Sequence, residues 1–225
     1  MVTDSSDQQE PETIDCSGLD SAGILAAVGD CEEGKSYELQ NLKAESSSFG
    51  CGIAIPNSVR IPVSVGDFSF LLAQETDWEI EGNAGHCCGH STASGRVLIK
   101  GTCGDFLAAS ATGGFVAVLG RGGDYCGFQL SGGEVLVRSM VGNAAGSYMR
   151  DGVLVLANGA GEELGKGMTG GDIYLRGKAK SVSEGVRVVR VKDAQAMRLS
   201  LLLARAGITG DVKEFKLYQA RKQKS

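Results

Sequence analysis

A period of 19 residues runs through the middle of the chain and restricts it to a small set of folds. Glycine recurs in each unit with the spacing G-x-x-G-x-x-x-G, and six of the seven members of the middle column are glycine. Because glycine is 34 of 225 residues, such a column should hold about one by chance. The repeat glycines are Gly66, Gly85, Gly89, Gly104, Gly123, Gly127, Gly142, Gly146, Gly161 and Gly165.

Each unit opens with two apolar residues spaced two apart, the pattern of a strand that buries one face. The pairs are Val59 and Ile61, Trp78 and Ile80, Val97 and Ile99, Val116 and Val118, Val135 and Val137, Leu154 and Leu156, and Ile173 and Leu175. A 19-residue unit is too short to hold a crossover helix as well, so the strands must be joined by coiling. We therefore predict an all-β fold, a right-handed parallel β-helix of about seven 19-residue coils, with short N- and C-terminal helices as caps.

Stacked coils place equivalent residues about 4.8 Å apart, so each column of the repeat becomes a ladder of similar side chains. Apolar columns are expected to fill the interior. Glycine columns are expected at bends, where a positive φ or a close backbone approach leaves no room for a Cβ atom. A propeller blade is about twice as long, and leucine-rich repeats need leucine and asparagine at positions where these units lack them. Both alternatives are therefore excluded.

The chain divides into four parts. Residues 1–12 are predicted to be a disordered acidic tail, residues 13–58 an N-terminal cap, residues 59–184 the β-helix, and residues 185–225 a C-terminal helical segment and tail. In the cap, residues 13–16 and the alternation around Tyr37 and Leu39 predict strands. Asp20 or Ser21 can begin a short helix that Gly29 ends.

The C-terminal part carries helical signals. Asp193 can cap a helix that runs to about Arg205 and ends at Gly207. Its expected buried stripe is Met197, Leu201, Leu202 and Ala204. Val212, Phe215 and Tyr218 follow at helix-like spacing. These segments are available to cover the open ends of the β-helix, where strand edges would otherwise be unpaired.

Composition limits the cellular compartments and the kinds of partner that we expect for this chain. The net charge of −5, from 22 basic and 27 acidic residues, argues against a nucleic-acid-binding or anionic-membrane surface. The N-terminus lacks a secretion signal and no window approaches a membrane span, so we expect a cytoplasmic protein. The seven cysteines are odd in number and form no C-x-x-C pair, which favours reduced thiols.

The tandem units, as at Gly142 and Gly146, resemble the GXGXG β-helix domain that closes the large subunit of glutamate synthase. The closing segment 204–211, followed by Phe215 and Tyr218, is similar to the free-standing GXGXG subunit of N-methylglutamate synthase-type complexes. The β-helix subunit of formylmethanofuran dehydrogenase and of the formyltransferase/hydrolase complex uses the same coil and stays an alternative. The tail after Asp193 favours the first family.

The resemblance implies a structural role. In these families the GXGXG domain carries no catalytic residue and acts as a rigid spacer between catalytic partners. The implied partners are a glutamine amidotransferase and an FMN-dependent synthase that also holds an iron–sulfur cluster. No cofactor is then expected on this chain. Self-association through a regular face of the solenoid is a further expectation.

One segment contains residue types that bind metals. Residues 86–90 read His-Cys-Cys-Gly-His, and His86, Cys87 and His90 are the candidate ligands of a free-standing metal- or ligand-binding β-helix. In the repeat, however, His86 shares a polar column with Asp105, Asp124, Asn143 and Glu162. Cys88 falls in an apolar column with Leu107, Cys126, Ala145 and Leu164. The two columns should point apart, which favours stacked rungs over a metal site.

Two other patterns suggest chemistry. Residues 165–170 match G-x-G-x-x-G, but that motif binds dinucleotides where a strand ends and a helix begins. The 19-residue period explains the same glycines. Asp105 and Asp124, one coil apart, resemble a carboxylate pair, yet the coils lack the long loops that would form a substrate groove. We assign no catalytic residue.

Overall fold

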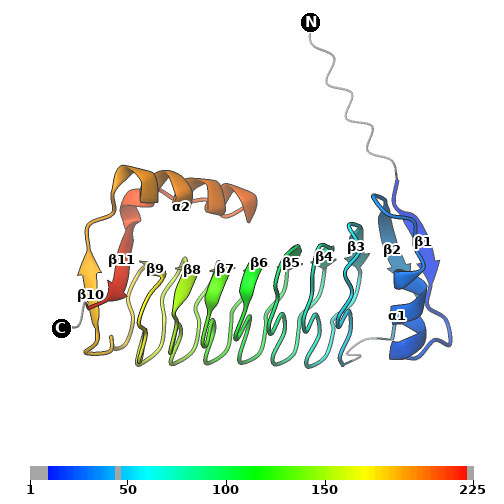
Figure 1. The fold of residues 1–225 in the computed structure, drawn as a ribbon, viewed down its shortest axis with the longest axis horizontal. Helices are drawn as coiled ribbons and strands as arrows, with labels where there is room; N and C mark the ends of the chain where they lie inside the picture. The colour runs from blue at the N-terminus through cyan, green and yellow to red at the C-terminus, as the bar shows by residue number, and fades with distance from the viewer. Residues whose placement is uncertain (1–9, 44–46, 222–225) are drawn as a thin grey trace, which may run out of the picture.

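The computed structural model describes residues 10–43 and 47–221. Most of the predicted acidic tail, residues 1–9, lies outside them. The described chain is a rod of stacked coils in which one long sheet runs the length of one side (Figure 1). The fold is the predicted all-β parallel β-helix, with two short helices in the described part.

The middle strands of this sheet follow the repeat, and further strands extend the sheet at both ends. They are β1 (Glu12–Asp15), β2 (Ser36–Gln40), β3 (Ser58–Ile61), β4 (Asp77–Ile80), β5 (Arg96–Ile99), β6 (Thr112–Val118), β7 (Ser131–Val137), β8 (Asp151–Leu156), β9 (Asp172–Arg176), β10 (Val186–Val189) and β11 (Phe215–Ala220). From β3 to β9 they pair in parallel, and Val97 faces Val116, which faces Val135. This register confirms one strand per 19-residue unit.

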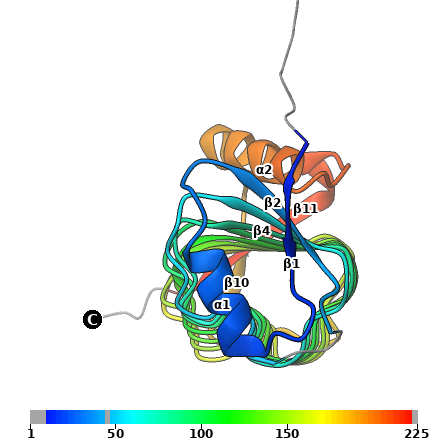
Figure 2. The same ribbon diagram turned by 90° about the vertical axis from the view of Figure 1, so that its right-hand side faces the viewer.

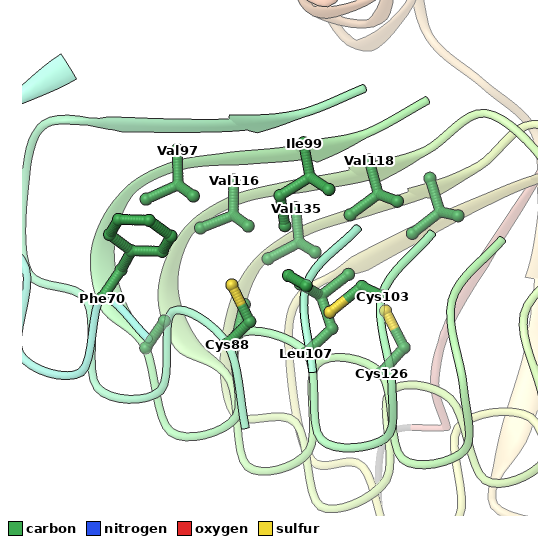
Figure 3. Close-up of a cluster of buried hydrophobic side chains, with 14 of the residues drawn as sticks. Phe70, Cys88, Val97, Ile99, Cys103, Leu107, Val116, Val118, Cys126 and Val135 are labelled. Atoms are coloured by element: carbon green, nitrogen blue, oxygen red, sulfur yellow. The ribbon is translucent and has the colours of Figure 1, made fainter. Parts of the chain in front are cut away.

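Side chains from the sheet and from the opposite bends fill the interior of the rod. Val97, Val116 and Val135 point down from the sheet towards Cys88 and Leu107 (Figure 3). At the N-terminal coils larger rings fill this space, with Phe70 and Trp78 5.1 Å apart between ring centroids. The interior is therefore solid rather than a channel, which suits a rigid rod.

Both reasons predicted for the glycine columns occur, at different columns. In the last column Gly89, Gly127, Gly146 and Gly165 have φ between 66° and 69°. In the middle column φ is not positive. There a Cβ on Gly123 would overlap the Oδ1 atom of Asp105 in the preceding coil, and a Cβ on Gly142 would overlap Asp124 Oδ1. Glycine is required in the middle column because the neighbouring coil occupies the space.

Helix α1 (Ser21–Gly29) closes the N-terminal end of the rod, as expected (Figure 2). The Asp20 side chain caps it by accepting a hydrogen bond from the Gly23 backbone at 2.8 Å. Ile24 and Val28 are buried in the same core as Leu39 of β2. The helix thus covers apolar side chains that an open end would expose to water.

Helix α2 (Asp193–Arg205) has the predicted bounds but buries a different stripe. Leu199, Leu202 and Leu203 pack on the outer face of the sheet, together with Leu136 and Tyr174. Of the predicted stripe only Leu202 is buried, while Met197, Leu201 and Ala204 face solvent. The prediction was wrong because the helix carries two apolar stripes, and periodicity does not say which one meets the sheet.

Contacts at the side of α2 select the orientation that is observed. The Arg205 guanidinium lies 4.1 Å from the centroid of the buried Phe115 ring. Arg198 Nη2 lies 3.2 Å from Glu134 Oε1 on β7. The helix runs along the side of the rod rather than across its end (Figure 1).

The segment after α2 is not the helix that the spacing of Val212, Phe215 and Tyr218 suggested. A single turn, η1 (Val212–Glu214), leads into strand β11, which lies between β9 and β10 and is antiparallel to both. Phe215 and Leu217 face the α2 cluster, whereas Tyr218 joins the interior core. β11 and β10 therefore extend the sheet at the C-terminal end.

Candidate functional site

The polar column predicted from the repeat forms a continuous ladder of hydrogen bonds along the rod. The predicted members run from His86 to Glu162, and the structure adds Asp67 of the preceding coil. The whole set, here called the polar ladder, is Asp67, His86, Asp105, Asp124, Asn143 and Glu162. From Asp67 to Asn143, each side chain accepts a hydrogen bond from the backbone N–H of the next member, 19 residues later, and Glu162 is the last donor. The Asp67 Oδ1 to His86 N distance is 2.7 Å, and Asn143 Oδ1 lies 2.9 Å from Glu162 N. These bonds tie each coil to the next outside the sheet.

A second, shorter ladder runs beside it. Ser64 Oγ accepts from the backbone N–H of Asn83 at 2.9 Å, and Asn83 Oδ1 accepts from that of Thr102 at 2.8 Å. At these bends side-chain oxygens, rather than backbone carbonyls, accept the hydrogen bonds from Asn83 N and Thr102 N. The outward polar side chains are therefore structural acceptors.

His86 takes part in the polar ladder through its ring. Its Nδ1 lies 3.0 Å from the backbone N of Asp105 and accepts a hydrogen bond from that N–H. His90 is occupied differently, with Nδ1 2.8 Å from Ser91 Oγ. Within residues 10–43 and 47–221, no group of three or more His, Cys, Asp or Glu side chains is arranged to hold a metal ion.

Of the two cysteines between these histidines, Cys88 points into the rod, whereas the candidate ligand Cys87 is only half-buried. Cys88, Cys103 and Cys126 are buried in the interior (Figure 3). Contact with the Cys103 thiol and burial raise the pKa of Cys88 well above its usual value, and burial likewise raises the pKa of Cys126. The neutral thiol is therefore strongly favoured, whereas metal binding and nucleophilic attack need the thiolate.

The other two patterns also lie in the solenoid. Gly165 and Gly167 have φ of 69° and 65° and form a bend, with no helix beginning there. This is not the strand-to-helix turn that a dinucleotide site uses. Asp105 and Asp124 each use Oδ1 to accept a backbone hydrogen bond, at 2.8 Å and 2.6 Å. The sequence motif and the carboxylate pair thus have structural explanations.

A hollow lies on the outer face of the sheet near the N-terminal coils. It has a volume of about 650 Å³ and includes Glu12, Lys35, Arg60 and Glu79 in its lining. These side chains are engaged in ion pairs, such as Arg60 with Glu81 at 2.9 Å and Lys35 with Glu12 at 2.8 Å. The hollow is open, and its charges neutralise one another rather than converging on a bound group.

Aromatic side chains gather on the bends opposite the sheet. Phe106, Tyr125, Phe128 and Tyr148 form what we call the aromatic ridge. The rings of Phe106 and Tyr125 stack with centroids 4.8 Å apart and an interplanar angle of 4°. Phe106, Tyr125 and Tyr148 have φ of 59°, 58° and 56°, a region that bulky residues rarely adopt. The repeat tolerates this conformation because every coil bends in the same way.

The second exposed apolar surface is the outer side of α2. Ala194, Met197, Leu201 and Ala204, here called the α2 stripe, follow one another at spacings of three, four and three residues. Met197 is 69% exposed and Leu201 is 66% exposed. This spacing is that of a seam on which another helix packs. Exposed apolar surface of this kind marks interaction sites.

Some of these features could not be read from the sequence. The polar column was predicted, but its hydrogen bonds were not, although carboxylates and amides 19 residues apart are the available signal. The aromatic ridge was missed because Phe106, Phe128 and Tyr148 fall in different columns of the repeat. Only the bend of the backbone brings them together.

The coils, the ladders and the closely packed interior define a β-solenoid with glycines at its bends. The polar side chains of its ladders stabilise the fold. Comparison with family models matches residues 58–205 to the GXGXG motif family. Because the match covers more than half of the chain, the protein belongs to this family. Comparisons with curated proteins and with solved structures found no match. In the described part of the chain, neither helix is long and apolar enough to cross a membrane.

Proposed function

We propose that this chain is the non-catalytic structural subunit of a glutamate synthase-like complex of the N-methylglutamate synthase type. In such a complex it holds a glutamine amidotransferase and an FMN-dependent synthase at a fixed distance. FMN and the iron–sulfur cluster belong to the partner subunits, and this chain binds no cofactor. Membership of the GXGXG motif family supports this proposal, since glutamate synthases carry such a domain.

The observation that carries the proposal is that side chains of the polar ladder already accept hydrogen bonds from the backbone. A catalytic site needs polar groups that converge on one point and remain available to a substrate. In the polar ladder the side chains are spread along the rod and, from Asp67 to Asn143, each already accepts a backbone hydrogen bond. A solid rod whose ladder side chains, within the described residues, do not converge on one point suits a spacer better than an enzyme.

The α2 stripe is the surface on which we place a catalytic partner. Its residues project from a helix whose other face is buried against the sheet, so the stripe is held at a fixed position on the rod. The Arg205 to Phe115 and Arg198 to Glu134 contacts fix the rotation of the helix. A partner that buries Met197 and Leu201 would gain about 3–6 kcal/mol before entropic costs.

Affinity purification of the tagged chain from its own cells tests the proposal. The expected result is co-purification of a glutamine amidotransferase and a flavin-containing synthase, with flavin absorbance in the complex and none in the isolated chain. Recovery of formyl-transfer subunits, or of the chain alone, would contradict it.

The double substitution Met197→Asp with Leu201→Asp tests the surface. It should reduce recovery of one partner about tenfold or more while leaving the melting temperature of the isolated chain within about 2 °C. Ser200→Asp is the matched control, because Ser200 is exposed on the same helix outside the stripe. Equal losses for both variants would remove the α2 stripe from the interface.

A further inference from the structure

The two ends of the rod carry opposite charge. At the N-terminal end, the segment from residue 10 to residue 43 exposes carboxylates against Lys35 and Lys43. These carboxylates belong to Glu10, Glu12, Asp15, Asp20, Asp30, Glu32 and Glu33. At the C-terminal end, exposed cationic side chains surround β10 against Glu184 and Asp193. They belong to Lys178, Lys180, Arg187, Arg190, Lys192 and Arg221.

Several cations of the C-terminal end have no ion-pair partner within the described chain. Arg187, Arg190 and Lys192 form no ion pair with any residue in 10–43 or 47–221. By contrast, Lys35, Arg60 and Lys100, nearer the N-terminal end, each form ion pairs with carboxylates within the chain. The basic end therefore keeps its attraction for an acidic surface.

Each end also presents a free edge of the sheet. The strand order places β1 at one edge and β10 at the other, at opposite ends of the rod (Figure 1). Their outer backbone N–H and C=O groups have no strand partner in the described structure. A free edge of this kind is a template on which a further strand can add.

The direction of the two edge strands is compatible with a continuous sheet. β11 is antiparallel to β9, and β10 is antiparallel to β11, so β10 runs in the same direction as β9. The strands from β1 to β9 share that direction because they pair in parallel. If a second rod is placed end to end in the same orientation, its β1 meets β10 in parallel.

We propose that copies of this chain associate head to tail, with the basic β10 edge of one copy adding to the acidic β1 edge of the next. Like charges at two identical ends repel, which blocks pairing of two β1 edges or two β10 edges. Opposite charges leave one productive contact, between unlike ends. Such a heterologous contact builds a chain of rods or closes into a ring. The association concerns the isolated subunit and stands apart from the proposed catalytic partners.

Sedimentation velocity of the purified full chain tests this directly. We expect the average sedimentation coefficient to rise with protein concentration at about 0.02 M NaCl, and the apparent Kd to weaken about tenfold or more at about 0.5 M NaCl, because salt screens exposed charges. A monomer at every concentration in low salt would overturn the proposal. So would association that does not depend on salt.

Charge reversal identifies the surfaces. The variant Glu10→Lys with Glu12→Lys leaves five carboxylates against four lysines at the N-terminal end and so removes most of its acidic charge. The variant Arg187→Glu with Arg190→Glu leaves four cations against four carboxylates at the C-terminal end and so removes its basic charge. Each variant keeps the other end unaltered. Each should be monomeric alone, and an equimolar mixture of the two should associate again. A mixture that stays monomeric, or a single variant that associates like the unaltered chain, would overturn the proposal.

The matched control changes the same charge in the middle of the rod. Arg121→Glu with Arg150→Glu alters two exposed arginines on central coils and should associate like the unaltered chain. If this control also becomes monomeric, net charge rather than the rod ends governs association, and the proposal fails. Melting curves of all three variants establish that each remains folded.

Discussion

The Oδ1 atom of Asp105 accepts a hydrogen bond from the backbone N–H of Asp124 at 2.8 Å, across one complete coil of the rod. The same relationship, repeated from Asp67 to Glu162, joins successive coils on the side away from the sheet. A residue type that looks catalytic in the sequence is thus used as a backbone acceptor. Substitutions that keep or remove the accepting atom separate this structural role from a chemical one.

The first prediction concerns the charge of the polar ladder. Asp124→Asn keeps an oxygen that can accept from Asn143 N, as Asn143 itself does towards Glu162. Asp124→Ala removes it, and the free energy of unfolding should fall by about 1 kcal/mol relative to the asparagine variant. Urea denaturation of both variants measures this difference. Equal stabilities would mean that the side-chain oxygen contributes nothing.

The second prediction concerns the middle glycine column. A Cβ on Gly142 would overlap Asp124 Oδ1 and would lie 2.8 Å from Asp124 N. Gly142→Ala should therefore lower the free energy of unfolding by about 2–3 kcal/mol, because the coils cannot separate without breaking the sheet. Gly185→Ala is the control, since no atom lies within 4 Å of its Cβ position. Similar unfolding midpoints for the two variants would refute the close-approach explanation.

The third prediction concerns pH. Hydrogen bonds from the Asn41 side chain and from Ser17 lower the pKa of Asp15 from 3.8 to about 2. Because the folded-state pKa is lowered, the ionised Asp15 carboxylate contributes to the free energy of unfolding. This contribution is complete above pH 3.8 and is lost as the pH falls through about 2. Carbon NMR titration of the Asp15 carboxyl should show this midpoint, and Asn41→Ala should move it upwards. An unchanged midpoint in that variant would contradict the assignment of the cause.

The fourth prediction separates a ladder rung from a metal ligand at His86. His86→Asn preserves an acceptor for Asp105 N, so stability should stay within about 0.5 kcal/mol, whereas His86→Ala should lose about 1 kcal/mol. Elemental analysis of the purified chain should find no stoichiometric zinc or iron. Stoichiometric metal that disappears in His86→Asn would establish the alternative.

The repeat determines how much of this fold follows from sequence. Strands β3 to β9 were predicted because each coil rests on the next in one register, so that Val97 and Val116 must be alike. At the C-terminal part the period ends and local patterns become ambiguous. Leu199 and Leu201 lie on different faces of one helix, and only packing against Tyr174 and Leu136 selects Leu199 for burial.

The same limit applies to the segment after α2. Phe215 and Tyr218 are three residues apart, as on a helix, yet they belong to strand β11 and point to opposite faces of the sheet. The pairing with β9 decides this, since Tyr218 lies opposite Ile173. The prediction of candidate sites relied on local motifs and met the same limit. His86 and His90 are four residues apart, but their rings bond to different neighbours.

The central claim is that this chain holds partners in place and performs no chemistry. Reconstitution of the complex from separately purified subunits, with and without this chain, tests it most directly. We predict that glutamine hydrolysis and flavin reduction persist without the chain, while glutamine-dependent amination requires it. Loss of either half-reaction on omitting the chain, or full glutamine-dependent amination without it, would contradict the account.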